Sequence, residues 1–192
     1  DGTLTNRVTY VEVVGLVIQG PTVTVYERHY LSMGRNNVIQ SKVGMRSNTY
    51  RTNVQDIALT RDGGVFLYTS GTMKTFGLGH FGARGDGTFD TTETLTDVVD
   101  GSLQTLTGVV SIDAGAEWFC VALREDGTVW SWGNNQEGEL GHSGTTNVST
   151  AIQVPGLANI VKISCHMSRT LALDSTGSVH VFGAGDVATI ES

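Results

Sequence analysis

Residues Gly77 to Gly82 read GLGHFG, which fits the Gly-x-Gly-x-x-Gly pattern of a dinucleotide-binding loop. In such a site the glycines let the backbone approach a pyrophosphate, and the loop joins a strand to a helix. No helical pattern follows Gly82, and the same glycine spacing occurs again at Gly133 and Gly138. A loop that recurs along the chain indicates a scaffold, so we predict no cofactor.

The spacing of the other reactive residues does not favour a metal or catalytic site. No two of the five histidines have the short spacing of a metal-ligand pair, and Cys165 and His166 form an isolated doublet in what we predict to be a packed loop. Neither a Gly-x-Ser-x-Gly elbow nor a catalytic cysteine context occurs. Glu137 and Glu139 fall in a polar loop, where we expect solvated carboxylates. We predict no metal site and no catalytic residue, with hydrolysis by paired carboxylates as an open alternative.

The composition is that of a folded, acidic chain of 192 residues. Hydrophobic residues make up 39% and charged residues 16%, which is typical of a packed domain. The formal net charge of -7 argues against a nucleic-acid surface, which needs a basic stripe. No apolar run has the length of a membrane span, and two cysteines do not make a disulfide framework. With 25 glycines and 2 prolines, we expect β-strands joined by tight turns.

The sequence repeats itself most clearly in its second half. VALREDGTVWSWG at Val121–Gly133 matches LALDSTGSVHVFG at Leu171–Gly183, 50 positions later. Each copy predicts a strand covered on both faces, a tight turn at a glycine and a second, alternating strand. Trp130 and Trp132 share one face of that second strand. Because the counterparts of Trp132 are phenylalanines, we expect Trp132 in the core and Trp130 nearer the surface.

Two further copies are predicted upstream. In Ile57–Val65 (IALTRDGGV) a leucine precedes Gly63 by four residues, as it precedes the turn glycine in the two later copies. With Gly63 as the hairpin turn, the distance to Gly77 is eight residues longer than in those copies, which predicts an insertion in this hairpin. A fourth copy is predicted from three residues that lie 43 positions before Leu59, Gly63 and Gly77, namely Leu16, Gly20 and Gly34.

This pattern resembles the regulator of chromosome condensation repeat. The match begins at Ala114–Gly115, continues through Asp126–Gly127 and Trp132–Gly133, and ends with Leu140–Gly141 and Pro155. The resemblance implies an all-β fold, a β-propeller of four-stranded antiparallel blades with about 50 residues in each blade and about seven blades in the ring. The chain then forms a single partial β-propeller domain, about half of the ring, over residues 1–192, with approximate repeats at 1–44, 45–100, 101–156 and 157–192.

A half ring has two uncovered blade faces. Each would expose on the order of 1,000 Å², more than soluble monomers usually expose in one patch. Residues Asp1–Thr5 also resemble Asp126–Trp130, which would place the start of the chain inside a blade. We therefore expect the rest of the propeller to come from the same longer chain or from another subunit.

The predicted function is that of a non-enzymatic interaction or scaffold propeller, which presents its loops to a protein partner or a cell-surface glycan. The Thr-, Gly- and Asn-rich composition favours a virion or extracellular surface over the cytoplasm or nucleus, with a structural or receptor-binding role. The resemblance alone implies the alternative, guanine-nucleotide exchange on a small GTPase, and an enzyme with an appended propeller is a third class. The residues expected to bind the partner are Leu78, His80, Phe81, Trp130, Asn134, Asn135, Gln136 and Glu137.

Overall fold

The structure is a computed structural model that describes residues 7–19, 22–33, 38–41, 46–50 and 53–185. The chain divides into two compact units, Asp1–Val54 and Gln55–Ser192. Apart from one 3-10 turn, η1 (His80–Gly82), the regular elements among the described residues are β-strands, and the strand pairings are antiparallel. The all-β prediction is confirmed.

The first unit contains one sheet built on a long hairpin. Strand β1 (Arg7–Gln19) pairs with β2 (Thr22–Met33), with two irregularities of register along β1. Strand β2 also pairs with both β3 (Val38–Ser41) and β4 (Arg46–Tyr50). The strands of this sheet therefore do not lie in simple chain order.

The fourth predicted copy falls in this unit. Leu16 lies in β1, whereas Gly20 and Gly34 lie outside the described residues. The sheet order here differs from that of the sheets in the second unit. The boundaries of the four repeats therefore remain predictions.

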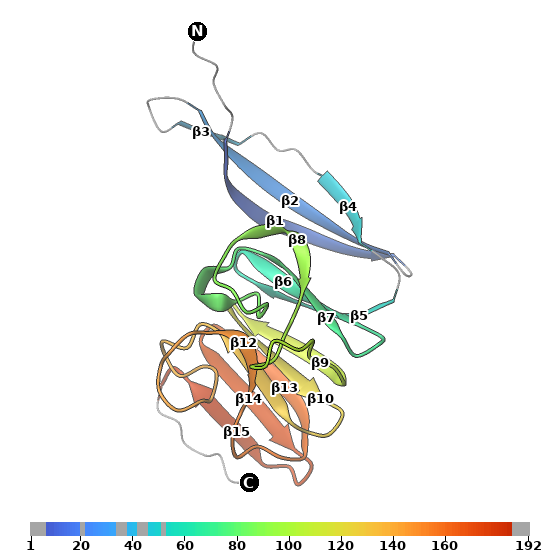
Figure 1. Cartoon of the computed structure of the whole chain (residues 1–192), viewed down its shortest axis with the longest axis vertical. Helices are drawn as coiled ribbons and strands as arrows, with labels where there is room; N and C mark the ends of the chain where they lie inside the picture. Colours follow the sequence, from blue (N-terminus) through green and yellow to red (C-terminus); the bar gives the residue numbers. More distant parts are fainter. Residues whose placement is uncertain (1–6, 20–21, 34–37, 42–45, 51–52, 186–192) are drawn as a thin grey trace. The chain divides into compact units, whose positions relative to one another are not determined.

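The second unit contains three sheets that follow one another along the chain, as the colours of Figure 1 show. The strands of the first sheet, β5 to β8, are Val54–Thr60, Gly63–Tyr68, Met73–Gly77 and Thr92–Asp97. Those of the second sheet, β9 to β12, are Val109–Gly115, Phe119–Arg124, Val129–Gly133 and Val148–Gln153. The described strands of the third sheet, β13 to β15, are Ile160–His166, Arg169–Asp174 and Val179–Gly183. In each sheet the strands pair in chain order.

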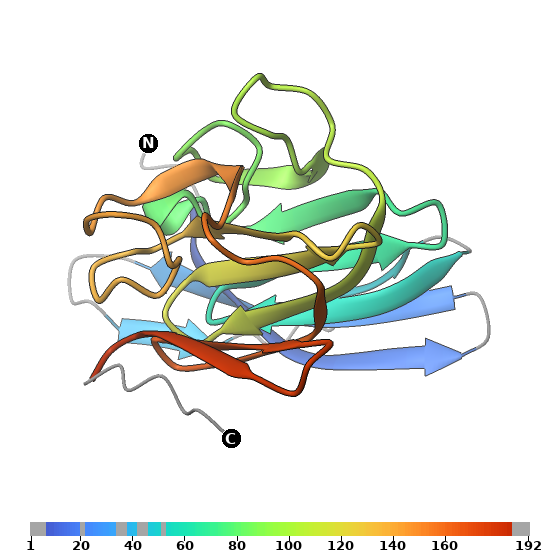
Figure 2. The same ribbon diagram turned by 90° about the horizontal axis from the view of Figure 1, so that it is seen from below.

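Two hydrophobic clusters hold neighbouring sheets together. The first joins the first and second sheets and includes Leu67, Met73, Ile112 and Trp132. The second joins the second and third sheets and includes Val121, Val129, Ile163 and Ala172. In Figure 2 the red strands of the third sheet lie beside the yellow and olive strands of the second. Each large side chain buried in this way stabilises the fold by about 1.5–3 kcal/mol.

The sequence predictions for the second sheet are confirmed. Strand β10 is buried along almost its whole length, because one of its faces packs in the first hydrophobic cluster and the other face packs in the second. Trp132 is 0% exposed, and Trp130 is half-buried on the same face. Gly127 lies in the hairpin turn with φ 77°.

The third predicted copy has the wrong register. Gly63 is not the hairpin turn but the first residue of β6, where it pairs with Gly77. The turn lies at Gly71 (φ 75°), six residues before Gly77, and the hairpin therefore contains no insertion. The error arose because Leu59 precedes Gly63 by four residues and Leu67 precedes Gly71 by the same distance.

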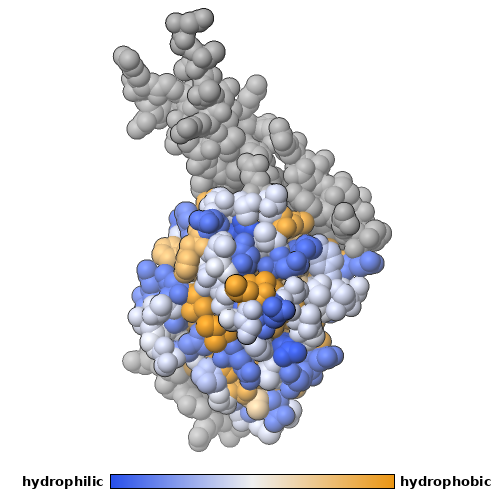
Figure 3. All heavy atoms as spheres, in the orientation of Figure 1, coloured by the Kyte–Doolittle hydropathy of each residue, from blue (hydrophilic) through white to orange (hydrophobic). Residues whose placement is uncertain are grey.

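The surface of the second unit mixes hydrophilic and hydrophobic residues, and on the face in Figure 3 the hydrophobic residues form small patches. In the third sheet Leu171 is 41% exposed, whereas its counterpart in the second sheet, Val121, is 0% exposed beneath the third sheet. The exposed large apolar side chains among the described residues are Leu59, Phe89, Leu103, Val110, Ile152, Val161, Met167 and Leu171.

Candidate interaction site at the blade junctions

Three short turns and two long loops lie at the same end of their strands in the second unit. The turns join β5 to β6, β9 to β10 and β13 to β14, and the loops, 78–91 and 134–147, follow β7 and β11. They share one end because successive strands are antiparallel. We call this end the loop face. All the predicted partner-binding residues except Trp130 lie in these loops; Trp130 is near the other end of β11, where its indole donates to Thr128 Oγ1 at 3.1 Å.

One backbone hydrogen bond ties each loop to the turn beside it. The N–H group after each third strand donates to a turn carbonyl sixteen positions earlier, at 3.1, 3.0 and 2.9 Å, in the pairs Leu78–Asp62, Asn134–Trp118 and Ala184–Ser168. The residue before each donor is a glycine with positive φ. At Gly133 φ is 107°, and a Cβ would lie 2.3 Å from the Trp118 carbonyl oxygen, so only glycine fits. The three junctions share a backbone and differ in their side chains.

The predicted residues of loop 134–147 divide into two buried and two exposed ones. Asn134 and Asn135 are 5% and 1% exposed, whereas Gln136 and Glu137 are exposed. The Asn135 amide donates from Nδ2 to the Gly144 carbonyl oxygen at 3.1 Å, and its Oδ1 accepts a backbone N–H at 3.1 Å. Asn135 therefore holds the loop together, while Gln136 and Glu137 present side chains to solvent.

Glu139 contradicts the expectation of a solvated carboxylate. It is 0% exposed; its Oε2 accepts the N–H group of Glu137 at 2.8 Å, and its Oε1 has no partner among the described residues. Burial raises the pKa of Glu139, and the nearby charges of Glu137 and Glu117 add to the increase. The polar neighbours in the sequence concealed this burial. The counterpart of Glu139 in the other loop is Ala83, an apolar residue that is 5% exposed. The apolar residue type at this equivalent position is the sequence signal that could have indicated a buried site.

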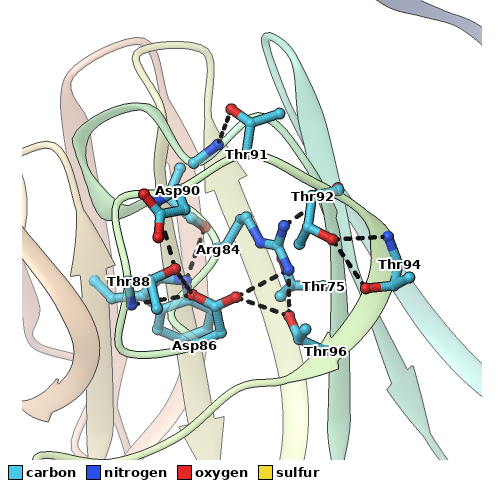
Figure 4. Close-up of polar contacts among 12 residues, drawn as sticks. Thr75, Arg84, Asp86, Thr88, Asp90, Thr91, Thr92, Thr94 and Thr96 are labelled. Atoms are coloured by element: carbon cyan, nitrogen blue, oxygen red, sulfur yellow. Dashed lines mark hydrogen bonds and ion pairs between the residues drawn. The ribbon is translucent and has the colours of Figure 1, made fainter.

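Loop 78–91 is held by a buried ion pair instead (Figure 4). Arg84 is 1% exposed, and its Nη2 lies 2.9 Å from Asp86 Oδ2. Its guanidinium also donates to Thr96 Oγ1 at 2.6 Å and to the Thr92 carbonyl oxygen at 3.2 Å, and the Thr96 hydroxyl donates to Asp86 at 3.0 Å. Burial lowers the pKa of Arg84, and Asp86 opposes this shift. The network points inward and stabilises the loop, a role that sequence reasoning did not assign to Arg84.

Both loops also bond to the next sheet. The Ala83 carbonyl oxygen accepts the indole N–H of Trp132 at 3.0 Å. The Glu139 carbonyl oxygen accepts the Thr170 hydroxyl at 2.9 Å. Each loop is therefore part of the seam between two blades.

Where the loop faces of the first two sheets meet, four side chains surround Trp118. Its indole donates from Nε1 to Asp62 Oδ2 at 2.7 Å. The Arg61 guanidinium lies 4.9 Å from the indole centroid, and the Phe81 and His80 rings lie 5.2 and 6.3 Å from it, centroid to centroid. These residues come from two turns and one loop. We call the five residues the Trp118 cluster.

The Trp118 cluster combines exposure with backbone strain. Arg61 and His80 are exposed, and Phe81 and Trp118 are half-buried. Trp118 and Phe81 have φ values of 60° and 57°, a left-handed conformation that costs a bulky residue about 1–3 kcal/mol. Such strain concentrates at functional sites. The cluster is not repeated, because Ser168 occupies the position of Trp118 in the next blade.

Sequence reasoning identified part of this cluster. His80 and Phe81 were predicted, whereas Arg61 and Asp62 were assigned to the wrong turn by the register error. Trp118 was not among the predicted partner-binding residues. The signal that could have found it is the change of residue type at equivalent positions, since core positions such as Trp132 keep their apolar character in every copy.

The described residues contain no group of three or more His, Cys, Asp or Glu suited to a metal ion. Cys165 lies in β13, which corrects its predicted place in a loop. Cys120 is buried and Cys165 half-buried, and burial raises the pKa of both thiols. Within the described part of the chain, no helix has the length and apolar character needed to cross a membrane.

Sheets of consecutive antiparallel strands, packed face to face in chain order, define a β-propeller. Comparison with protein families shows which kind of propeller repeat the chain contains. One profile of the regulator of chromosome condensation (RCC1) repeat matches residues 126–173, and a second profile of this repeat matches residues 109–139. Residues 109–173 therefore carry RCC1 repeats, as the sequence pattern predicted.

Two human relatives match this chain over a small part of their own length. Protein RCC2 is 45% identical over 63 residues, which is 32% of this chain and 12% of the relative. The E3 ubiquitin-protein ligase HERC2 is 30% identical over 157 residues, which is 79% of this chain and 3% of the relative. The chain spans a small fraction of both proteins.

Solved structures show the same fold. Human WBSCR16 superposes with a TM-score of 0.64 at 20% identity, over 91% of this chain and 48% of that one. Yeast RCC1 (Prp20), solved with Kap60, superposes with a TM-score of 0.62 at 22% identity, over 90% of this chain and 42% of that one. The chain covers slightly less than half of the length of each of these two structures.

Proposed function

We propose that the loop face binds a protein partner, with the Trp118 cluster as its anchor. The observation that carries this proposal is a strained, partly exposed aromatic cluster at one junction that the next junction lacks. Tryptophan and arginine are enriched among the residues that dominate interface free energies. Gln136 and Glu137 extend the same face.

Structural relatives support a protein partner. Yeast RCC1 (Prp20) was crystallised bound to Kap60, and the Prp20p structure was described with its binding to Gsp1p and histones. The virion, receptor-binding and glycan expectations rest on composition alone. Guanine-nucleotide exchange rests on the family resemblance alone, and we assign no described residue to it.

The test begins by identifying partners of the intact protein through proximity labelling. Binding of the purified partner is then measured by calorimetry, with thermal unfolding of each variant as a check on folding. We expect Trp118→Ala to weaken binding by about tenfold or more. Trp130→Ala removes the same side chain at the opposite end of the blade and should leave the affinity unchanged. Equal losses in both variants would contradict the proposal.

The same variants address the exchange alternative. Nucleotide release from a panel of small GTPases is measured with the wild-type protein and with Trp118→Ala. Acceleration that Trp118→Ala abolishes would identify a GTPase as the partner. No acceleration across the panel would remove the alternative and leave protein binding as the function.

A further inference from the structure

Two arginines in the described part of the chain stack on tryptophans, and their polar surroundings differ. Arg124 lies 5.8 Å from the Trp130 ring centroid, and it also donates to the Thr107 carbonyl oxygen at 2.9 Å and pairs with Asp126 at 3.3 Å. Arg61 lies closer to its ring, at 4.9 Å from Trp118.

The guanidinium of Arg61 makes no ion pair or hydrogen bond with any described residue, and the side chain is exposed. Arg124 therefore has donors committed within its own blade, whereas Arg61 is exposed and its donors bond to no described residue.

A stacked guanidinium still has its N–H groups available. The group has five N–H donors, and its contact with the indole ring is a cation–π contact, which leaves donors available for an oxygen acceptor. Asp62 fixes the indole by accepting its N–H at 2.7 Å, and the Phe81 ring packs against it at 5.2 Å. The platform under Arg61 is thereby held in place, which reduces the entropy that the side chain loses when it binds a ligand.

We propose that Arg61 recognises a carboxylate of the protein partner through a two-pronged hydrogen bond from its guanidinium edge. The inference rests on the proposed function of the loop face and names the chemistry of the partner at one point. The geometry of the fork matches a carboxylate, and paired N–H···O bonds of this kind are about twice as strong as neutral ones. The partner group is an aspartate, glutamate or chain-terminal carboxylate.

The charges around Arg61 favour a single carboxylate over a phosphate or an acidic tract. Asp62 is its chain neighbour, Glu117 lies on the adjacent turn beside Trp118, and the whole chain has a net charge of -7. Repulsion from these carboxylates grows with the charge of the ligand, so a dianion or a run of acids is disfavoured relative to a single carboxylate.

The test uses NMR on the intact protein with a minimal probe, the capped dipeptide N-acetyl-glycyl-aspartyl amide. We expect saturable shifts of the Trp118 indole N–H and the Arg61 Nε–H resonances, assigned through Trp118→Phe and Arg61→Gln. Arg61→Gln should weaken the response of the indole by about tenfold or more. The matched variant Arg124→Gln should leave it unchanged. The asparagine dipeptide and inorganic phosphate at equal concentration should give smaller shifts.

Several outcomes would overturn the inference: equal shifts with the asparagine dipeptide, a stronger response to phosphate, or equal losses in Arg61→Gln and Arg124→Gln. These failures differ from failure of the proposed function. If Trp118→Ala abolishes partner binding and the aspartyl probe does not bind, the carboxylate site is refuted and the interaction surface stands. If the probe binds Arg61 and no partner depends on Trp118, the interaction surface is refuted and the carboxylate site stands.

Discussion

Loops 78–91 and 134–147 have the same length and the same backbone junction, yet different chemistry holds each of them. The first is closed by the buried ion pair of Arg84 and Asp86. The second is closed by the Asn135 amide and contains the buried Glu139. The blade therefore specifies the loop through its backbone hydrogen bonds and turn glycines, and different interior side chains are compatible with the same loop backbone.

The largest effect on stability is expected when a residue of loop 78–91 is replaced by its counterpart in loop 134–147. Arg84→Leu, which copies the equivalent Leu140, leaves Asp86 with an unpaired buried charge and should lower the free energy of unfolding by about 3–5 kcal/mol. The double variant Arg84→Leu/Asp86→Ala removes both charges and should recover most of that loss. Chemical denaturation measures both values. A double variant as unstable as the single one would show that the ion pair itself stabilises the loop.

A second comparison separates packing from backbone strain. Gly82 and Gly138 both have φ 80°, but a Cβ on Gly82 would lie 2.7 Å from Ser149 Cα, whereas a Cβ on Gly138 meets nothing within 4 Å. Gly138→Ala should cost about 1 kcal/mol from strain alone, and Gly82→Ala about 3 kcal/mol. Thermal unfolding of the two variants provides the test. Equal costs would mean that strain dominates at both sites.

Asn135 tests whether a predicted binding residue is structural. Asn135→Ala removes the bond to Gly144 and leaves the buried N–H group of Leu140 without its acceptor, which should cost about 1–3 kcal/mol. Gln136→Ala, at the exposed neighbouring position, should change stability by about 0.5 kcal/mol or less. If the Asn135→Ala protein were as stable as the wild type and bound the partner more weakly, Asn135 would be a binding residue and not a structural one.

A small effect of the opposite sign, a gain in stability, is expected at Glu139. Because burial raises the folded-state pKa of Glu139 above its usual 4.5, the charged form destabilises the fold at neutral pH, and Glu139→Gln should stabilise the protein by about 1 kcal/mol. The carboxyl binds a proton more readily when folded. As the pH falls through the folded-state pKa toward 4.5, the wild-type protein gains stability and its deficit relative to Glu139→Gln should disappear. Denaturation at several pH values measures this, and a constant difference would contradict it.

Most of the propeller fold was predictable because the same spacing between residues recurs wherever the same strands and turns recur. The second and third sheets follow directly from the 50-residue offset, whereas the first sheet was misread because Leu59 and Leu67 each precede a glycine by four positions. The site was less predictable. The burial of Glu139 is set by the packing of its loop, and the stacking of Arg61 on Trp118 depends on how two neighbouring blades meet, which no local pattern encodes.

The bond from the Trp132 indole to the Ala83 carbonyl oxygen couples recognition to stability. Ala83 belongs to the loop that carries His80 and Phe81, and Trp132 lies in the core of the next blade. Mass action then requires that a ligand which binds the ordered loop, and not the opened one, stabilise the seam by an amount that grows with ligand concentration. The occupied protein should therefore exchange its Trp132 indole proton more slowly with solvent deuterium than the free protein does.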